Sequence, residues 1–101
     1  EAQFGDVDVL ITTSTMDPAC RIDDKAAIEY THPRQSRVPF NLSGHPALSV
    51  PCGLSRDGLP LAVQIVGRRW GEAALYGAAS AFERLAGWSA LSPAGTNSVV
   101  R

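Results

Sequence analysis

Long apolar runs and an excess of either charge are both missing from this sequence. No run approaches the roughly 18 apolar residues that span a bilayer, and the N-terminus has neither the basic start nor the apolar stretch of a secretory signal. Lys plus Arg number 9 and Asp plus Glu number 10, so the net charge is −1 and no basic surface for nucleic acid or anionic lipid is expected. These absences predict a cytoplasmic protein that binds neither nucleic acid nor a membrane.

Residues that bind metals are scarce as well. Cys20 and Cys52 have no close-spaced partner, and His32 and His45 have no third ligand at a metal-binding spacing. We therefore expect no metal, no cofactor and two reduced, structural thiols. The glycines do not gather into a run that opens a helix, so the sequence does not predict a phosphate-binding loop.

Candidate catalytic side chains are few. The one lysine, Lys25, stands in a run of carboxylates that favour its charged form, whereas a lysine that acts as a base must first lose its proton. Ser43, His45 and Asp17 could be drawn as a Ser-His-Asp triad. Their spacing lacks the strand-turn-helix setting of such a nucleophile, so we expect these three residues to be structural.

The stretch from Pro39 to Gly67 is the most informative, and it predicts a β-hairpin. Two runs of alternating residues flank Asp57-Gly58, a pair that tolerates the positive φ of a tight reversal. Pro51 cannot donate a ladder hydrogen bond, so it should lie at a sheet edge, a bulge or a strand end. The second run is apolar or small on both faces except at Gln64, and we expect this strand to be covered on both sides in a larger assembly. The alternation places on one side of their strands Leu48, Val50 and Cys52 in the first run and Leu61, Val63 and Ile65 in the second.

Four short motifs, taken in order, resemble the C-terminal part of the amidase signature family. The resemblance covers roughly residues 4–88, and the ordered series carries it rather than any single motif. The chain departs from the family at Thr13, where the family usually has proline. The motifs are Asn41-Leu42-Ser43-Gly44, Pro46-Ala47-Leu48-Ser49-Val50-Pro51-Cys52-Gly53, Asp57-Gly58-Leu59-Pro60 and Gln64-Ile65-Val66-Gly67.

This resemblance implies hydrolysis or transfer at a carboxamide by a Ser, cis-Ser, Lys triad that lies upstream of the matched motifs. No Gly-Gly-Ser-Ser-Gly type of loop occurs here, so no triad residue is carried over. The sequence therefore predicts the C-terminal portion of an amidase-family hydrolase that is inactive in isolation, with a small-molecule amide as substrate of the full-length enzyme only. The alternative is a noncatalytic structural or self-associating remnant that uses the exposed hairpin as an interaction surface. Association with the missing amidase portion or with a second copy is expected.

Three residues are candidates for a substrate pocket, because the resemblance implies that the segment before the hairpin lines it. Arg34 and Arg37 could bind an anionic end of a substrate, since guanidinium groups pair with carboxylates. They could equally be two solvated arginines on an exposed loop. Asn41 lies between two apolar residues in a region expected to be buried, so its amide must be hydrogen-bonded. It could pin the loop to neighbouring backbone or contact substrate.

The fold class that the sequence predicts is α/β, with about three strands and one main amphipathic helix packed on the sheet. Residues 4–13 should form a strand with an exposed beginning and a buried end. Residues 23–38 should form a loop with at most one helical turn, because Pro33 stops it. Residues 72–86 should form the main helix, closed by Gly87. We expect an amidase-like region over residues 1–91 and a flexible tail over 92–101.

Overall fold

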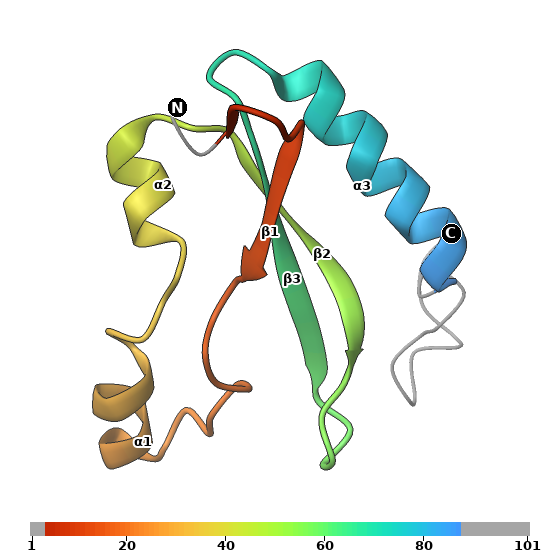
Figure 1. The fold of residues 1–101 in the computed structure, drawn as a ribbon. Coiled ribbons are helices and arrows are strands. Elements are labelled where there is room, and N and C mark those ends of the chain that lie inside the picture. Colours follow the sequence, from red (N-terminus) through yellow and green to blue (C-terminus); the bar gives the residue numbers. More distant parts are fainter. Residues whose placement is uncertain (1–3, 88–101) are drawn as a thin grey trace, which may run out of the picture.

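A computed structural model describes residues 4–87 of the chain. Its centre is a three-stranded antiparallel sheet in the order β1-β3-β2, so the last strand in the sequence lies in the middle. Helix α3 lies on one side of this sheet, and the segment that carries α1 and α2 lies on the other (Figure 1). The α/β class is therefore confirmed. The elements are β1 (Val9–Thr13), α1 (Lys25–Thr31), α2 (Val38–Ser43), β2 (Ala47–Leu54), β3 (Pro60–Gly67) and α3 (Glu72–Ala86).

The hairpin of β2 and β3 forms as predicted. Its loop is closed by a hydrogen bond from the backbone N–H of Ser55 to the carbonyl oxygen of Leu59 (2.8 Å). Gly58 has a φ of +80°, which is the positive value that the Asp-Gly pair predicts. The register shifts between Pro51 and Gly53, and β2 is an edge strand, so two of the three settings proposed for Pro51 occur together.

The main helix and the apolar core also agree with the sequence. Helix α3 spans Glu72–Ala86, and Gly87 closes it with a φ of +68° and an N–H bond to the carbonyl oxygen of Glu83 (3.0 Å). Leu75 and Ala79 are buried against the sheet, where they form one cluster with Val50 and Ile65. Burial of this apolar stripe holds the helix in place.

The first strand differs from its prediction in length and in direction of burial. Only Val9–Thr13 pairs with β3, whereas Phe4 lies outside the strand and is buried with its ring stacked on His45. Ile11, near the end expected to be buried, is 65% exposed. The reason is the position of α3, which covers β2 and β3 more than the edge strand β1.

Helix α1 replaces part of the loop predicted over residues 23–38, and α2 begins at the end of that loop. Asp24 caps α1, with a side-chain oxygen that accepts from the N–H of Ala27 (3.0 Å), and this cap supports seven helical residues rather than one turn. Pro33 does follow the end of this helix. In α2, proline lies in the first turn, where a missing N–H does no harm, and Gly44 ends the helix with a φ of +74°.

No helix in the described part of the chain is long and apolar enough to cross a membrane. Residues 88–91 of the predicted amidase-like region, and the predicted tail over 92–101, lie outside the described residues.

Candidate substrate pocket

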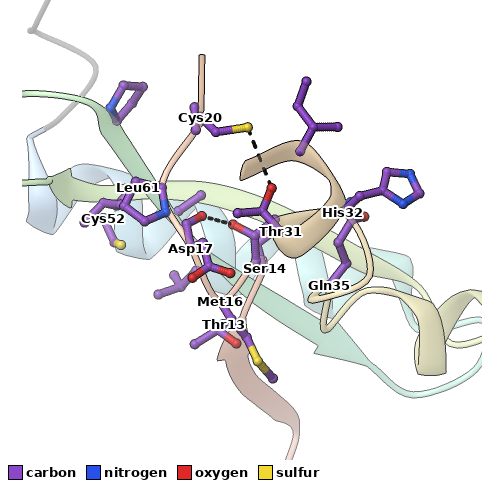
Figure 2. A pocket seen from close by; sticks show the side chains of 17 residues that line it. Thr13, Ser14, Met16, Asp17, Cys20, Thr31, His32, Gln35, Cys52 and Leu61 are labelled. Atoms are coloured by element: carbon purple, nitrogen blue, oxygen red, sulfur yellow. Dashed lines mark hydrogen bonds between the residues drawn. The ribbon is translucent and has the colours of Figure 1, made fainter. Parts of the chain in front are cut away.

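A cavity of about 800 Å³ lies beside the first residues of β3, between the chain that leaves β1 and helix α1. Figure 2 shows Cys52 and Leu61 on one side of it and Thr31, His32 and Gln35 on the other. Its lining comes from four parts of the chain: Thr13 to Cys20; Ile28, Thr31, His32 and Gln35; Cys52; and Pro60 to Val63.

The cavity exists because β1 is shorter than β3. The ladder between them ends at the pair Thr13–Val63, so the first residues of β3 have no partner on β1. Beyond Thr13 the chain pairs with a different segment, through the bridge Thr15–Gln35 and a hydrogen bond from the N–H of Met16 to the carbonyl oxygen of Arg34 (3.2 Å). The divergence leaves an opening with a strand on one side and a helix on the other.

The walls of the cavity combine apolar side chains with hydroxyl groups that already have partners. The Ser14 hydroxyl lies 3.0 Å from that of Ser49, and the Thr31 hydroxyl donates to the carbonyl oxygen of Ala27 (2.9 Å). The thiol of Cys20 lies 3.7 Å from the Thr31 hydroxyl, as the dashed line in Figure 2 marks. Neither Ser14 nor Cys20 is hydrogen-bonded to a base among the described residues, so neither is set up as an activated nucleophile.

Arg34 does not line this cavity, although the sequence predicts that it contributes to a substrate pocket. Its Nε donates to a carboxylate oxygen of Asp17 (2.7 Å), and its guanidinium carbon lies 4.8 Å from the centre of the Tyr30 ring. The hydrogen bond to Asp17 raises the pKa of Arg34 above its usual value. An anion at this guanidinium would have to compete with Asp17, so in this chain Arg34 ties the α1–α2 connection to the chain that follows β1.

The other two candidates lie on the surface. Arg37 is exposed and donates to the side-chain oxygen of Gln35, which does line the cavity. Asn41 is exposed in α2, so the expectation that it is buried is wrong. The reason is that residues 38–43 form a short surface helix in which no residue is buried.

Sequence reasoning indicated the segment before the hairpin but not the individual residues that line the cavity. Gln35, Thr31 and Ser14 belong to segments with no periodic pattern, and they meet only because the chain after β1 pairs with the connection between α1 and α2. The signal in the sequence that points to this place is the family resemblance, which implies that the segment before the hairpin lines the pocket. Thr31, His32 and Gln35 of that segment do line the cavity.

The drawn Ser-His-Asp combination does not assemble. Ser43 Oγ and His45 Nδ1 are 2.7 Å apart. The Asp17 carboxylate is hydrogen-bonded to Arg34 instead, and Asp17 lines the cavity beside the first residues of β3. The Ser43–His45 pair is part of a packed corner instead, where Arg69 donates to the carbonyl oxygen of Ser43 (2.8 and 3.1 Å). The structural interpretation of these three residues therefore agrees with the geometry.

Lys25 is the first residue of α1 and is exposed. No hydrogen bond joins it to a serine among residues 4–87, so the pairing that a Ser, cis-Ser, Lys triad needs is not formed there. Within the same residues, no group of three His, Cys, Asp or Glu side chains is placed to hold a metal ion.

The sequence model of the Amidase family matches residues 1–76, which is most of the chain. This protein belongs to the amidase family. Among curated proteins it is similar to the A subunit of the glutamyl-tRNA(Gln) amidotransferase from Bacillus thuringiensis (strain Al Hakam), from Bacillus cereus (strain B4264) and from Bacillus anthracis (strain CDC 684 / NRRL 3495). Each is 38% identical over 86 residues, a match that covers 83% of this chain and 18% of the relative. The chain thus spans less than a fifth of the length of these relatives.

Proposed function

We propose that this chain is the C-terminal portion of an amidase-family enzyme that hydrolyses or transfers the nitrogen of a carboxamide. In this proposal the chain supplies one wall of the substrate pocket, and the nucleophile and the base come from the remainder of the enzyme. The observation that carries the proposal is the coverage: a family match over residues 1–76 combined with only 18% of the length of the relatives.

The chemistry of the described residues also supports the proposal that the nucleophile and the base come from the remainder of the enzyme. A lysine that relays a proton must be desolvated or placed near other cations so that it can become neutral. Lys25 is instead exposed at the first position of a surface helix, close in sequence to Asp23 and Asp24. The isolated chain is therefore expected not to hydrolyse amides.

Arg37 is the strongest candidate to bind an anionic end of a substrate in that enzyme. Its guanidinium is exposed and already contacts Gln35 on the cavity wall. Arg34 would then fix the position of this loop through Asp17, and Asn41 would lie one helix further along the surface. All three assignments are proposals for the full-length enzyme.

The test is ammonia release from a panel of aliphatic and aromatic amides, first with the purified chain and then with the full-length polypeptide to which it belongs. We expect no release above buffer from the chain and release from the full-length protein. In that protein, Arg37→Met should raise KM for amides that carry a carboxylate and leave KM for neutral amides unchanged. Release by the isolated chain that survives Lys25→Ala would show that a catalytic group lies within these residues, and the proposal would fail.

A noncatalytic, self-associating role is the second candidate, and the position of β2 favours it. This strand is at the edge of the sheet, and its last residue, Leu54, is 53% exposed. An exposed edge strand can pair with a second copy or with another chain. Sedimentation over a wide concentration range distinguishes the two roles, because a chain that stays monomeric throughout has no self-association to support the second one. The relatives are named as subunits, so co-purification with a second polypeptide is a further expectation.

A further inference from the structure

Gln64 places an uncharged amide in the buried centre of the sheet. It lies on β3, is 2% exposed, and has Ile65 and Val66 as buried neighbours in sequence. Because side chains alternate along a strand, Gln64 points away from the core that Ile65 shares with α3. A buried amide of this kind is retained only where its polar atoms are hydrogen-bonded.

The hydrogen bonds of Gln64 lead across β1. Its Nε2 donates to the hydroxyl of Thr12, which lies directly opposite it on β1 (3.0 Å), and to the carbonyl oxygen of Ser36 (3.3 Å). Ser36 belongs to the connection between α1 and α2. One side chain therefore joins the central strand, the edge strand and the segment beyond that edge.

Apolar burial contributes little to fixing that segment. Neither α1 nor α2 has a fully buried residue, and apolar residues such as Ile28 and Phe40 are only partly buried, so less apolar surface is buried here than under α3. Its other ties include hydrogen bonds at the surface: the Thr13 and Ser36 hydroxyls (2.9 Å) are exposed, and the Arg34–Asp17 pair is partly exposed. Water competes with exposed pairs, which weakens them. The bond from Gln64 starts at a side chain that is 2% exposed, and it joins the segment directly to the central strand, whereas the surface pairs and the bridge Thr15–Gln35 join it to β1 or to the chain after β1.

We propose that Gln64 is a positioning residue that fixes the α1–α2 segment against the sheet and so sets the shape of the pocket. Gln35, next to Ser36, lines the cavity, as do Thr31 and Ile28 of α1. The place of these residues relative to β3 therefore follows from a hydrogen bond that starts on β3 itself. This role concerns the shape of the cavity and holds whether or not an amide is the ligand.

Hydrogen exchange on the 101-residue chain tests this role with a matched pair of variants. Gln64→Met keeps the length of the side chain and removes both donors, and Val66→Ala removes apolar volume from the same face of the same strand. For Gln64→Met we expect protection of the amides of residues 26–37 to fall by roughly 2- to 10-fold for each lost hydrogen bond, with little change in α3. Val66→Ala should lower protection evenly across the sheet and α3. Equal, even loss in both variants, or no loss over residues 26–37 in Gln64→Met, overturns the proposal.

Trypsin gives a second measurement that does not need amide assignments. Cleavage after Arg34 and Arg37 reports on the segment, and cleavage after Arg56, in the hairpin loop, is an internal reference. In Gln64→Met the first two sites should be cut faster relative to the third, and in Val66→Ala the ratio should stay as in the wild type. Should Gln64→Met fail to fold, Gln64→Asn decides, because it keeps a buried amide but shortens the side chain that reaches the carbonyl oxygen of Ser36. A selective rise at Arg34 and Arg37 in Gln64→Asn supports the proposal, and an unchanged ratio overturns it.

Discussion

The two faces of the sheet are stabilised in different ways. On the face toward α3, Val50, Ile65 and Leu75 make an apolar cluster. On the other face, a row of polar side chains runs across the strands, with Thr12, Gln64 and Ser49 in register. Apolar burial is proportional to area and has no preferred direction, whereas each polar contact works only at one distance and angle.

This difference between apolar burial and directional polar contacts explains which helices pack on each face of the sheet. The apolar face holds a fifteen-residue helix through the buried area of residues such as Leu75 and Ala79. The polar face holds two short helices without buried residues, through bonds to the connection between them. We therefore expect substitutions on the first face to change the stability of the whole domain, and those on the second to act locally.

Leu75→Ala should have the largest effect and is the strongest test of the apolar face. Leu75 is 3% exposed, and its truncation is expected to lower the free energy of unfolding by about 2–4 kcal/mol through lost burial and a cavity. Leu85→Ala, on the same helix at 89% exposure, is the control and should change it by no more than about 0.5 kcal/mol. Urea unfolding followed by circular dichroism measures both, and equal effects would contradict the proposed core.

The Ser14–Ser49 pair tests the polar face with a smaller expected effect. Each single change to alanine removes the 3.0 Å contact between the hydroxyls and should lower the free energy of unfolding by about 0.5–1.5 kcal/mol. The double variant should be less destabilised than the sum of the singles, because both remove the same bond. A double-mutant cycle by urea unfolding measures this coupling, and strict additivity would show that the contact contributes nothing.

Trp70 lies in the turn between β3 and α3 and belongs to neither face of the sheet. Substitutions there test backbone strain rather than packing on either face. It has a φ of +63°, a value that bulky residues rarely adopt, and it is 92% exposed, so little packing compensates. Trp70→Gly should be more stable than Trp70→Ala by about 0.5–1 kcal/mol, because alanine keeps the Cβ that causes the strain. Thermal unfolding of the two variants makes the comparison, and a more stable alanine variant would rule out strain at this turn.

Asp23 is expected to show the smallest effect, since it belongs to neither face. Its hydrogen bonds with Arg21 (2.8 and 2.9 Å) lower the pKa of the Asp23 carboxyl below its usual value. A lowered pKa in the folded chain means that the contribution to stability is present above the unfolded pKa and is lost as the pH falls through the folded one. Both side chains are exposed, so the change in unfolding free energy should be too small to resolve. An NMR titration should show the pKa of Asp23 rising in Arg21→Gln; an unchanged value would mean that the pair is not formed in solution.

The sequence predicts well the elements that depend on their own residues. Alternation and Asp57-Gly58 are enough for the hairpin, and the apolar stripe with Gly87 is enough for α3, since these signals are local. The sequence predicts at most one helical turn before Pro33, whereas the cap at Asp24 supports a helix of seven residues, α1. The cap adds stability at the start of a helix that a proline beyond its end does not remove.

The candidate site is harder to predict, because its residues are brought together by contacts distant in sequence. Nothing in the pattern around Ser36 indicates that its carbonyl oxygen meets Gln64, 28 positions later. Nor can the pairing of Arg34 with Asp17 be deduced, since it depends on where the chain goes after β1. A guanidinium in a polar loop looks the same in sequence whether a carboxylate of the chain or of a ligand binds it.

The strand order β1-β3-β2 has a consequence for the order of folding. Strands β2 and β3 are joined by a short loop and can pair as soon as both exist, because little chain must be ordered to bring them together. Strand β1 pairs only with β3 among the described strands, and Thr12 and Gln64 are 52 positions apart. A ribosome therefore completes β1 long before its partner is made. Among the described strands β1 therefore has no partner until β3 is synthesised, and it closes the longest loop of this sheet.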